Sequence, residues 1–124
     1  MSFVIDTGIL IDHLPGRPET GAWMSENGDQ GLAVSVITRA ELLAGMRPDE
    51  VDATTRLLGA LVTIPVDNRV ADVAGEYRRQ YFKSHGLLLP DALIAATART
   101  QRMTLVTLKV RDFPMTDLQI LRPY

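Results

Sequence analysis

Four acidic residues could share one site, because each stands where a predicted strand ends or a helix begins: Asp6, Glu41, Asp91 and Asp112. Two carboxylates about 4 Å apart repel by roughly 4 kcal/mol at an effective dielectric constant of 20. A cluster of them must take up protons or bind a cation. Oxygen ligands without Cys or His suit Mg²⁺ or Mn²⁺, and one or two such ions activate water and neutralise phosphate. The chemistry indicated is metal-assisted hydrolysis of a phosphodiester.

Each acid also has a structural interpretation that needs no ligand. Asp6 could cap the helix that follows it, and Asp112 could form a turn. Asp91 could be a first-turn acid that the helix dipole favours. Glu41 lies on a face of small or apolar residues, and it could be exposed or pair with Arg39. The joint placement of the four acids at one rim is what favours a site.

Other catalytic arrangements are missing from the sequence. It contains no cysteine, no Gly-rich phosphate loop ending in Gly-Lys-Ser/Thr and no GxGxxG after a strand. His13 and His85 stand near predicted helix ends, and neither is spaced as a triad base or a ligand pair. Ser35 lies within a predicted strand and lacks the turn that a nucleophile elbow requires.

Length and composition set further bounds. The chain has 124 residues, which predicts a single domain over residues 1–124. The formal charge of −2 argues against a protein that holds nucleic acid by bulk positive charge, but not against an enzyme with a metal and a few arginines. The absence of cysteine favours a reducing compartment, and we expect a cytoplasmic protein. Without a basic leader or an apolar run of about 20 residues, no membrane association is expected.

Apolar runs predict the sheet that would position the acids. Leu32 to Val36 is nearly continuous in apolar residues, the pattern of a strand buried on both faces in a parallel sheet. Phe3 to Asp6 and Thr104 to Thr107 are further strands. Val62 to Ile64 and Leu118 to Leu121 are weaker candidates, because prolines follow them.

Helical patterns fill the segments between these strands. Proline and acids favour a helix start at Pro48-Asp49-Glu50. Asp67 to about Ser84 is amphipathic, and Pro90 to Arg102 is apolar nearly all round. Strands that alternate with helices predict a parallel α/β sandwich, and in such sheets ligands bind beyond the carboxyl ends of the strands.

With these residues in hand, the chain resembles the PIN-domain family, specifically the VapC-type toxins of bacterial toxin–antitoxin pairs. Four strings in the family's order and spacing carry the resemblance: VIDTGILID, ITRAELLAG, LLPDALIAATA and TLVTLKVRDF. The resemblance covers essentially the whole length. It implies a three-layer α/β sandwich with a central, mainly parallel sheet of about five strands and helices on both faces.

The resemblance also implies an activity and partners. Proteins of this family are Mg²⁺- or Mn²⁺-dependent ribonucleases that cut RNA, usually form homodimers and are blocked by a cognate antitoxin. The family's site positions fall on the four acids and two hydroxyls: Asp6, Thr7, Glu41, Asp91, Thr107 and Asp112. Asp6, Asp91 and Asp112 would hold the metal. Glu41 would bind it through water or orient the attacking water.

Lys109 is the main departure from the family pattern. The family commonly has Asn two residues after the strand-end threonine, whereas this chain has a lysine there. Lys109 could pair with one acid and weaken metal binding, or point outward and hold RNA phosphate. Arg39 and Arg111 are the other candidates for phosphate contact, and each could equally be a surface charge.

Two other functions remain open on the sequence alone. A phosphoacceptor receiver domain also has about this length, a parallel sheet and a strand-end Thr and Lys, but it needs an acidic pair beside its first strand, where Asp6 stands alone. A PIN-like module that has lost catalysis, and only binds a protein partner or RNA, is kept open by Lys109. Stabilisation by a metal ion would separate the enzyme from this module.

Overall fold

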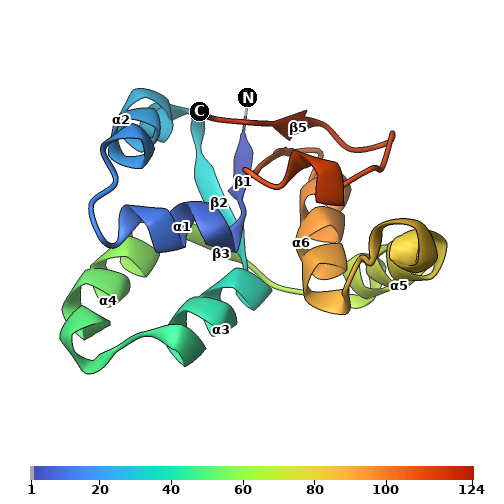
Figure 1. The fold of residues 1–124 in the computed structure, drawn as a ribbon, viewed down its shortest axis with the longest axis horizontal. Helices are drawn as coiled ribbons and strands as arrows, with labels where there is room; N and C mark the ends of the chain where they lie inside the picture. Colours follow the sequence, from blue (N-terminus) through green and yellow to red (C-terminus); the bar gives the residue numbers. More distant parts are fainter. Residues whose placement is uncertain (1) are drawn as a thin grey trace.

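The computed structural model describes residues 2–124 as a central sheet with helices packed on both faces (Figure 1). The strands are β1 Phe3–Ile5, β2 Leu32–Ser35, β3 Val62–Ile64, β4 Thr104–Val106 and β5 Ile120–Leu121. They lie in the order β3-β2-β1-β4-β5, and every neighbouring pair is parallel. The predicted three-layer sandwich with a parallel sheet is therefore confirmed. The strand order differs from the 2-1-3-4-5 order of receiver domains, which excludes that alternative.

In the part of the chain that the structure describes, six α-helices connect the strands. They are α1 Thr7–His13, α2 Pro18–Asn27, α3 Val36–Gly45, α4 Val51–Gly59, α5 Asn68–His85 and α6 Leu89–Thr100. Three short 3₁₀ turns accompany them: Gly28–Gln30, Pro48–Glu50 and Val110–Asp112. Within residues 2–124, no helix combines the length and the apolar character that crossing a bilayer would require.

Two hydrophobic cores lie on opposite faces of the sheet. Successive side chains along a strand point to opposite faces, so Val4 packs in the core of α5 and α6, whereas Phe3 and Ile5 pack in the core of α1 and α4. Figure 1 shows α5 and α6 on one side of the strands and α1 to α4 on the other. Each fully buried aliphatic side chain stabilises the fold by about 1.5–3 kcal/mol.

The strand order places one junction at the centre of the sheet. The chain leaves β1 for β2 on one side, and β4 returns to the other side of β1. Ligands of open α/β sheets bind at such a reversal, beyond the carboxyl ends of the strands. Asp6 and Thr107 are the residues that follow β1 and β4, so both lie at this junction.

Particular residues set both ends of α5 and the start of α6. Asp67 caps α5 by accepting a hydrogen bond from the Val70 amide (2.9 Å), and Gly86 ends the helix in the left-handed conformation with φ = 65°. Pro90 occupies the first turn of α6, where a missing amide hydrogen costs little. Four buried alanines allow α6 to approach α5 and the sheet closely: Ala92, Ala95, Ala96 and Ala98.

The structure differs from the sequence predictions at several boundaries. Three strands end earlier than predicted, at Ile5, Ser35 and Val106, because the next residue caps or begins a helix or turn. Pro48 begins a 3₁₀ turn, and the α-helix starts only at Val51. The helix at Pro18–Asn27 was not predicted, because its apolar residues are few and adjacent and so lack a clear helical period.

Candidate active site

Asp6 is the most deeply buried acid at the junction, with only 2% of its surface exposed. Its Oδ1 accepts a hydrogen bond from the Thr7 amide (2.9 Å), and its Oδ2 accepts one from Thr107 Oγ1 (2.7 Å). Burial raises the pKa of Asp6, because a carboxylate is less stable away from water; the bonds from Thr107 and Thr7 and the charge of Lys109 offset part of that increase. Asp6 thus caps α1, as its structural interpretation predicts, and also presents a carboxylate at the rim.

Thr107 and Lys109 form a turn directly beyond β4. The Lys109 amide donates a hydrogen bond to Thr107 Oγ1 (3.0 Å). The Thr107 hydroxyl in turn donates a hydrogen bond to Asp6 Oδ2. Thr107 is fully buried, so this hydroxyl cannot turn to water instead. The orientation of Asp6, which follows β1, is therefore fixed by a residue that follows the adjacent strand β4.

Asp91 enters the site from the first turn of α6. Its Oδ2 accepts a hydrogen bond from Lys109 Nζ at 3.2 Å. Partial burial lowers the pKa of Lys109, but the attraction of the surrounding carboxylates outweighs this effect, and the net pKa is raised. Those carboxylates belong to Asp6, Asp91 and Asp112. Lys109 therefore points into the acidic site, and of the two orientations open on the sequence the structure shows the inward one.

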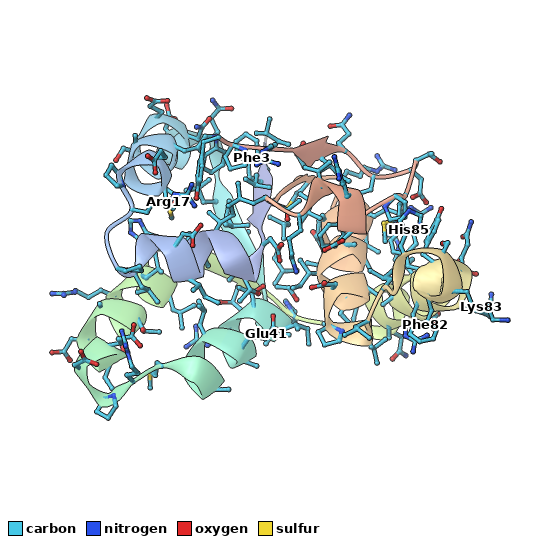
Figure 2. The ribbon with its side chains drawn as sticks, viewed as in Figure 1. Phe3, Arg17, Glu41, Phe82, Lys83 and His85 are labelled. Atoms are coloured by element: carbon cyan, nitrogen blue, oxygen red, sulfur yellow. The ribbon has the colours of Figure 1, made fainter. Side chains whose placement is uncertain are left out.

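Glu41 joins the site through Thr7. Its Oε1 accepts a hydrogen bond from Thr7 Oγ1 (2.7 Å), which in turn lies 2.9 Å from Thr38 Oγ1. Figure 2 shows Glu41 on α3, beside the start of α1. Glu41 itself is exposed, and its bonded partner is Thr7 and not Arg39. Thr7 therefore contacts both acids, because its amide donates to Asp6 Oδ1 and its hydroxyl donates to Glu41 Oε1.

The remaining predicted residues lie further from Asp6 or point elsewhere. Asp112 is exposed on the 3₁₀ turn after β4, and its negative charge contributes to the raised pKa of Lys109. Arg111 is exposed on the same turn. The Arg39 guanidinium approaches Thr63 Oγ1 of β3 (3.5 Å), so the structure does not bring it against the acids.

One contributor to the site was missed from the sequence. Thr38 is fully buried, and its hydroxyl contacts the Thr7 hydroxyl, which donates to Glu41. The available signal was its position three residues before Glu41 on a helix, a spacing that puts both side chains on one face.

The donor atoms suit a hard divalent cation, although they are not gathered around one point. Each oxygen of Asp6 accepts one hydrogen bond from the protein, which leaves further lone pairs, and Asp91 uses only Oδ2 for Lys109. Carboxylate oxygens are the ligands that Mg²⁺ and Mn²⁺ prefer. Within residues 2–124, however, no three acid or histidine side chains stand close enough together to hold a metal ion. The Lys109 ammonium supplies the positive charge among these acids.

Comparisons with known proteins agree on one family. The sequence pattern of the PIN domain matches residues 3–113 of the chain. Ribonuclease VapC19 of Mycobacterium tuberculosis is 41% identical over an alignment of 120 residues that covers 94% of this chain and 96% of that protein. Ribonuclease VapC10 of the same organism is 41% identical over 114 residues, 90% of this chain and 86% of that protein.

A solved structure gives the same result at the level of the fold. The toxin–antitoxin complex from Klebsiella pneumoniae contains a chain that matches with a TM-score of 0.81 and 28% sequence identity. The match covers 100% of this chain and 98% of that one. Since the family pattern covers most of the sequence, and relatives of the same length share two-fifths of their residues with it, this chain belongs to the PIN domain family.

Proposed function

We propose that this protein is a divalent-metal-dependent endoribonuclease that acts as the toxin of a toxin–antitoxin pair. The observation that carries the proposal is the bond between Thr107 Oγ1 and Asp6 Oδ2 (2.7 Å), which fixes a buried carboxylate at the centre of the sheet rim. The relatives named VapC10 and VapC19 are ribonucleases, and the Klebsiella pneumoniae structure is a toxin–antitoxin complex. We expect a cognate antitoxin as partner, a homodimer as the assembly and the cytoplasm, where RNA is found, as the location.

The proposed roles rest on the chemistry of the carboxylates and, for Asp6 and Glu41, on the hydroxyls that hold them. Asp6, Asp91 and Asp112 would hold Mg²⁺ or Mn²⁺, and the ion would acidify water and neutralise charge on the phosphate. Thr107 fixes the orientation of Asp6, since its hydroxyl donates to that carboxylate. Glu41 orients the water that attacks phosphorus in line with the leaving oxygen, and Thr7 holds Glu41 for this task. Arg111, exposed beside the acids, is a candidate contact for RNA phosphate.

Cleavage of total bacterial RNA tests this function. Purified protein, freed of any antitoxin, is incubated with Mg²⁺, with Mn²⁺ and with EDTA, and an Asp91→Asn protein prepared identically controls for contaminating ribonuclease. We expect discrete fragments that require the metal and are missing with the variant. Cleavage that persists in EDTA, or in the Asp91→Asn protein, would contradict the proposal.

A second candidate function is a PIN-fold module that binds a partner without cleaving RNA. The ion pair between Lys109 and Asp91 (3.2 Å) favours it, because it occupies an acid that a metal needs. The same cleavage experiment separates the two functions. Absence of cleavage with either metal, together with stable binding of an antitoxin or an RNA, would select the binding module.

A further inference from the structure

Lys109 is linked to both principal acids of the site. Its ammonium donates to Asp91 Oδ2 (3.2 Å), while its amide donates to the Thr107 hydroxyl that holds Asp6. The hydrogen bond of its amide fixes the backbone position of Lys109. From that position the side chain extends to Asp91 on α6. A lysine anchored in this way stays beside the acids even when its ammonium is released.

The ion pair is accessible enough to be exchanged. The side chain of Lys109 is 48% exposed and that of Asp91 is 26% exposed, so water can solvate either partner after separation. The ammonium bonds Oδ2 of Asp91 and places a positive charge beside the same carboxylate that a divalent cation would bind, so the two cations oppose each other there. The positive charge of Lys109 also repels any second cation that approaches Asp6 or Asp112.

On the basis of the function proposed above, we propose that Lys109 is a built-in competitor of the divalent cation for Asp91. The ammonium neutralises the carboxylate in the metal-free protein and is displaced when the ion binds. The site then loads only at higher metal concentration than the same acids would without this lysine. A neutral side chain at position 109 should therefore tighten metal binding.

Binding of Mn²⁺ alone tests the competition without any measurement of activity. The free ion is followed by its electron paramagnetic resonance signal during titration of the wild-type protein and of three variants: Lys109→Met, Lys109→Arg and Lys83→Met. Lys83 and Lys109 are the two lysines of the chain, and Lys83 is exposed on α5, far from Glu41 (Figure 2). Lys83→Met therefore removes the same charge from the whole molecule but not from the site.

We expect Lys109→Met to bind Mn²⁺ on the order of tenfold more tightly than the wild type, because one positive charge no longer opposes the ion in a partly solvated site. Lys109→Arg and Lys83→Met should bind as the wild type does. Equal or weaker binding by Lys109→Met would overturn the competition, and a raised KM for RNA in that variant would then assign Lys109 to phosphate. If none of the four proteins bound Mn²⁺, the metal-dependent function itself would be overturned.

Discussion

The side chains of Asp6 and Thr107 meet beyond the ends of β1 and β4, and their hydrogen bond joins the two strand ends at the site. The hydroxyl of Thr107 donates to Asp6 Oδ2 (2.7 Å) and accepts from the Lys109 amide (3.0 Å), so it has no hydrogen left for water. Residues that orient a metal ligand are commonly worth a 10- to 100-fold change in affinity or activity. A buried carboxylate is especially dependent on such a donor, because water cannot replace it.

Replacement of this hydroxyl should therefore impair cleavage while the fold persists. We expect Thr107→Val, which keeps the shape of the side chain, to lower the rate of RNA cleavage by about 10- to 100-fold. Thr104→Val is the matched control, because Thr104 is a buried threonine at the other end of β4 whose hydroxyl contacts Gln119 (3.3 Å). Cleavage rates and thermal melting of both variants are compared. Equal rates for the two would show that Thr107 does not position Asp6.

At the scale of whole elements, the sequence predicts best where periodicity is strong. The segments of α5 and α6 were predicted within one or two residues of their observed bounds, because their apolar residues recur along one face or fill the helix. The helix α2 was missed, since Trp23 and Met24 are adjacent and form no stripe. What holds α2 is tertiary packing, with Trp23 against Phe3 at a ring distance of 5.2 Å, which sequence spacing does not reveal.

The end of α5 provides a test in which one substitution has opposite effects at two positions. Gly86 ends the helix with φ = 65°, a conformation that strains any side chain, whereas Gly75 lies in the helix with open space around it. We expect Gly86→Ala to destabilise the protein by about 1 kcal/mol and Gly75→Ala to stabilise it by about 0.4–1 kcal/mol. Urea unfolding of both variants measures the difference. The same sign for both would contradict the assigned helix end.

A hydrogen-bonded group of one buried tyrosine and two exposed charged residues joins α5, α6 and the connection between β4 and β5. Tyr77 donates from its hydroxyl to Asp117 Oδ1 (2.8 Å), and Asp117 Oδ2 pairs with Arg99 Nε (2.8 Å). Burial, followed by the bond and charge of Asp117, raises the pKa of Tyr77 above its ordinary value of 10.0. The folded protein therefore keeps this proton at a pH where the unfolded chain loses it. The resulting stability is fully present below pH 10 and falls as the pH rises above it.

Melting temperatures between pH 8 and pH 11 test this linkage. The wild-type protein should lose more stability above pH 10 than Tyr77→Phe, which has the same ring and no titrating hydroxyl at that position. At pH 8 the variant should be less stable by roughly 1–2 kcal/mol, because the hydrogen bond to Asp117 is missing. Parallel losses in the two proteins would show that Tyr77 is not the group responsible.

For the molecule as a whole, the sequence predicts the fold, whereas the contacts of the acids come from the structure. Four acids at strand ends and helix starts were sufficient to predict one rim, because all strands of a parallel sheet end on the same side. Whether Lys109 reaches Asp91 depends on the path of the turn after β4 and on a flexible side chain. Neither is set by spacing along the sequence, so the sequence leaves the inward and outward orientations of Lys109 open and the structure shows the inward one.

The acids of the site and the residues of the two cores are largely separate, so we expect that the site can be changed without loss of the fold. Both hydrophobic cores are built from residues beneath the rim, and the acids lie beyond the strand ends. Asp6 is the exception in burial, yet burial raises its pKa, which means that the folded state tolerates its charge poorly. Removal of that charge should leave the metal-free protein at least as stable.

The most direct test of the account is the rate of RNA cleavage by Asp6→Asn at saturating Mn²⁺. Asp72→Asn, the same chemical change at an exposed position on α5, is the matched control. We expect Asp6→Asn to lose activity by roughly a hundredfold or more while it melts in EDTA at or above the wild-type temperature, and Asp72→Asn to cleave at the wild-type rate. Cleavage by folded Asp6→Asn at the wild-type rate would contradict the assignment of the active site.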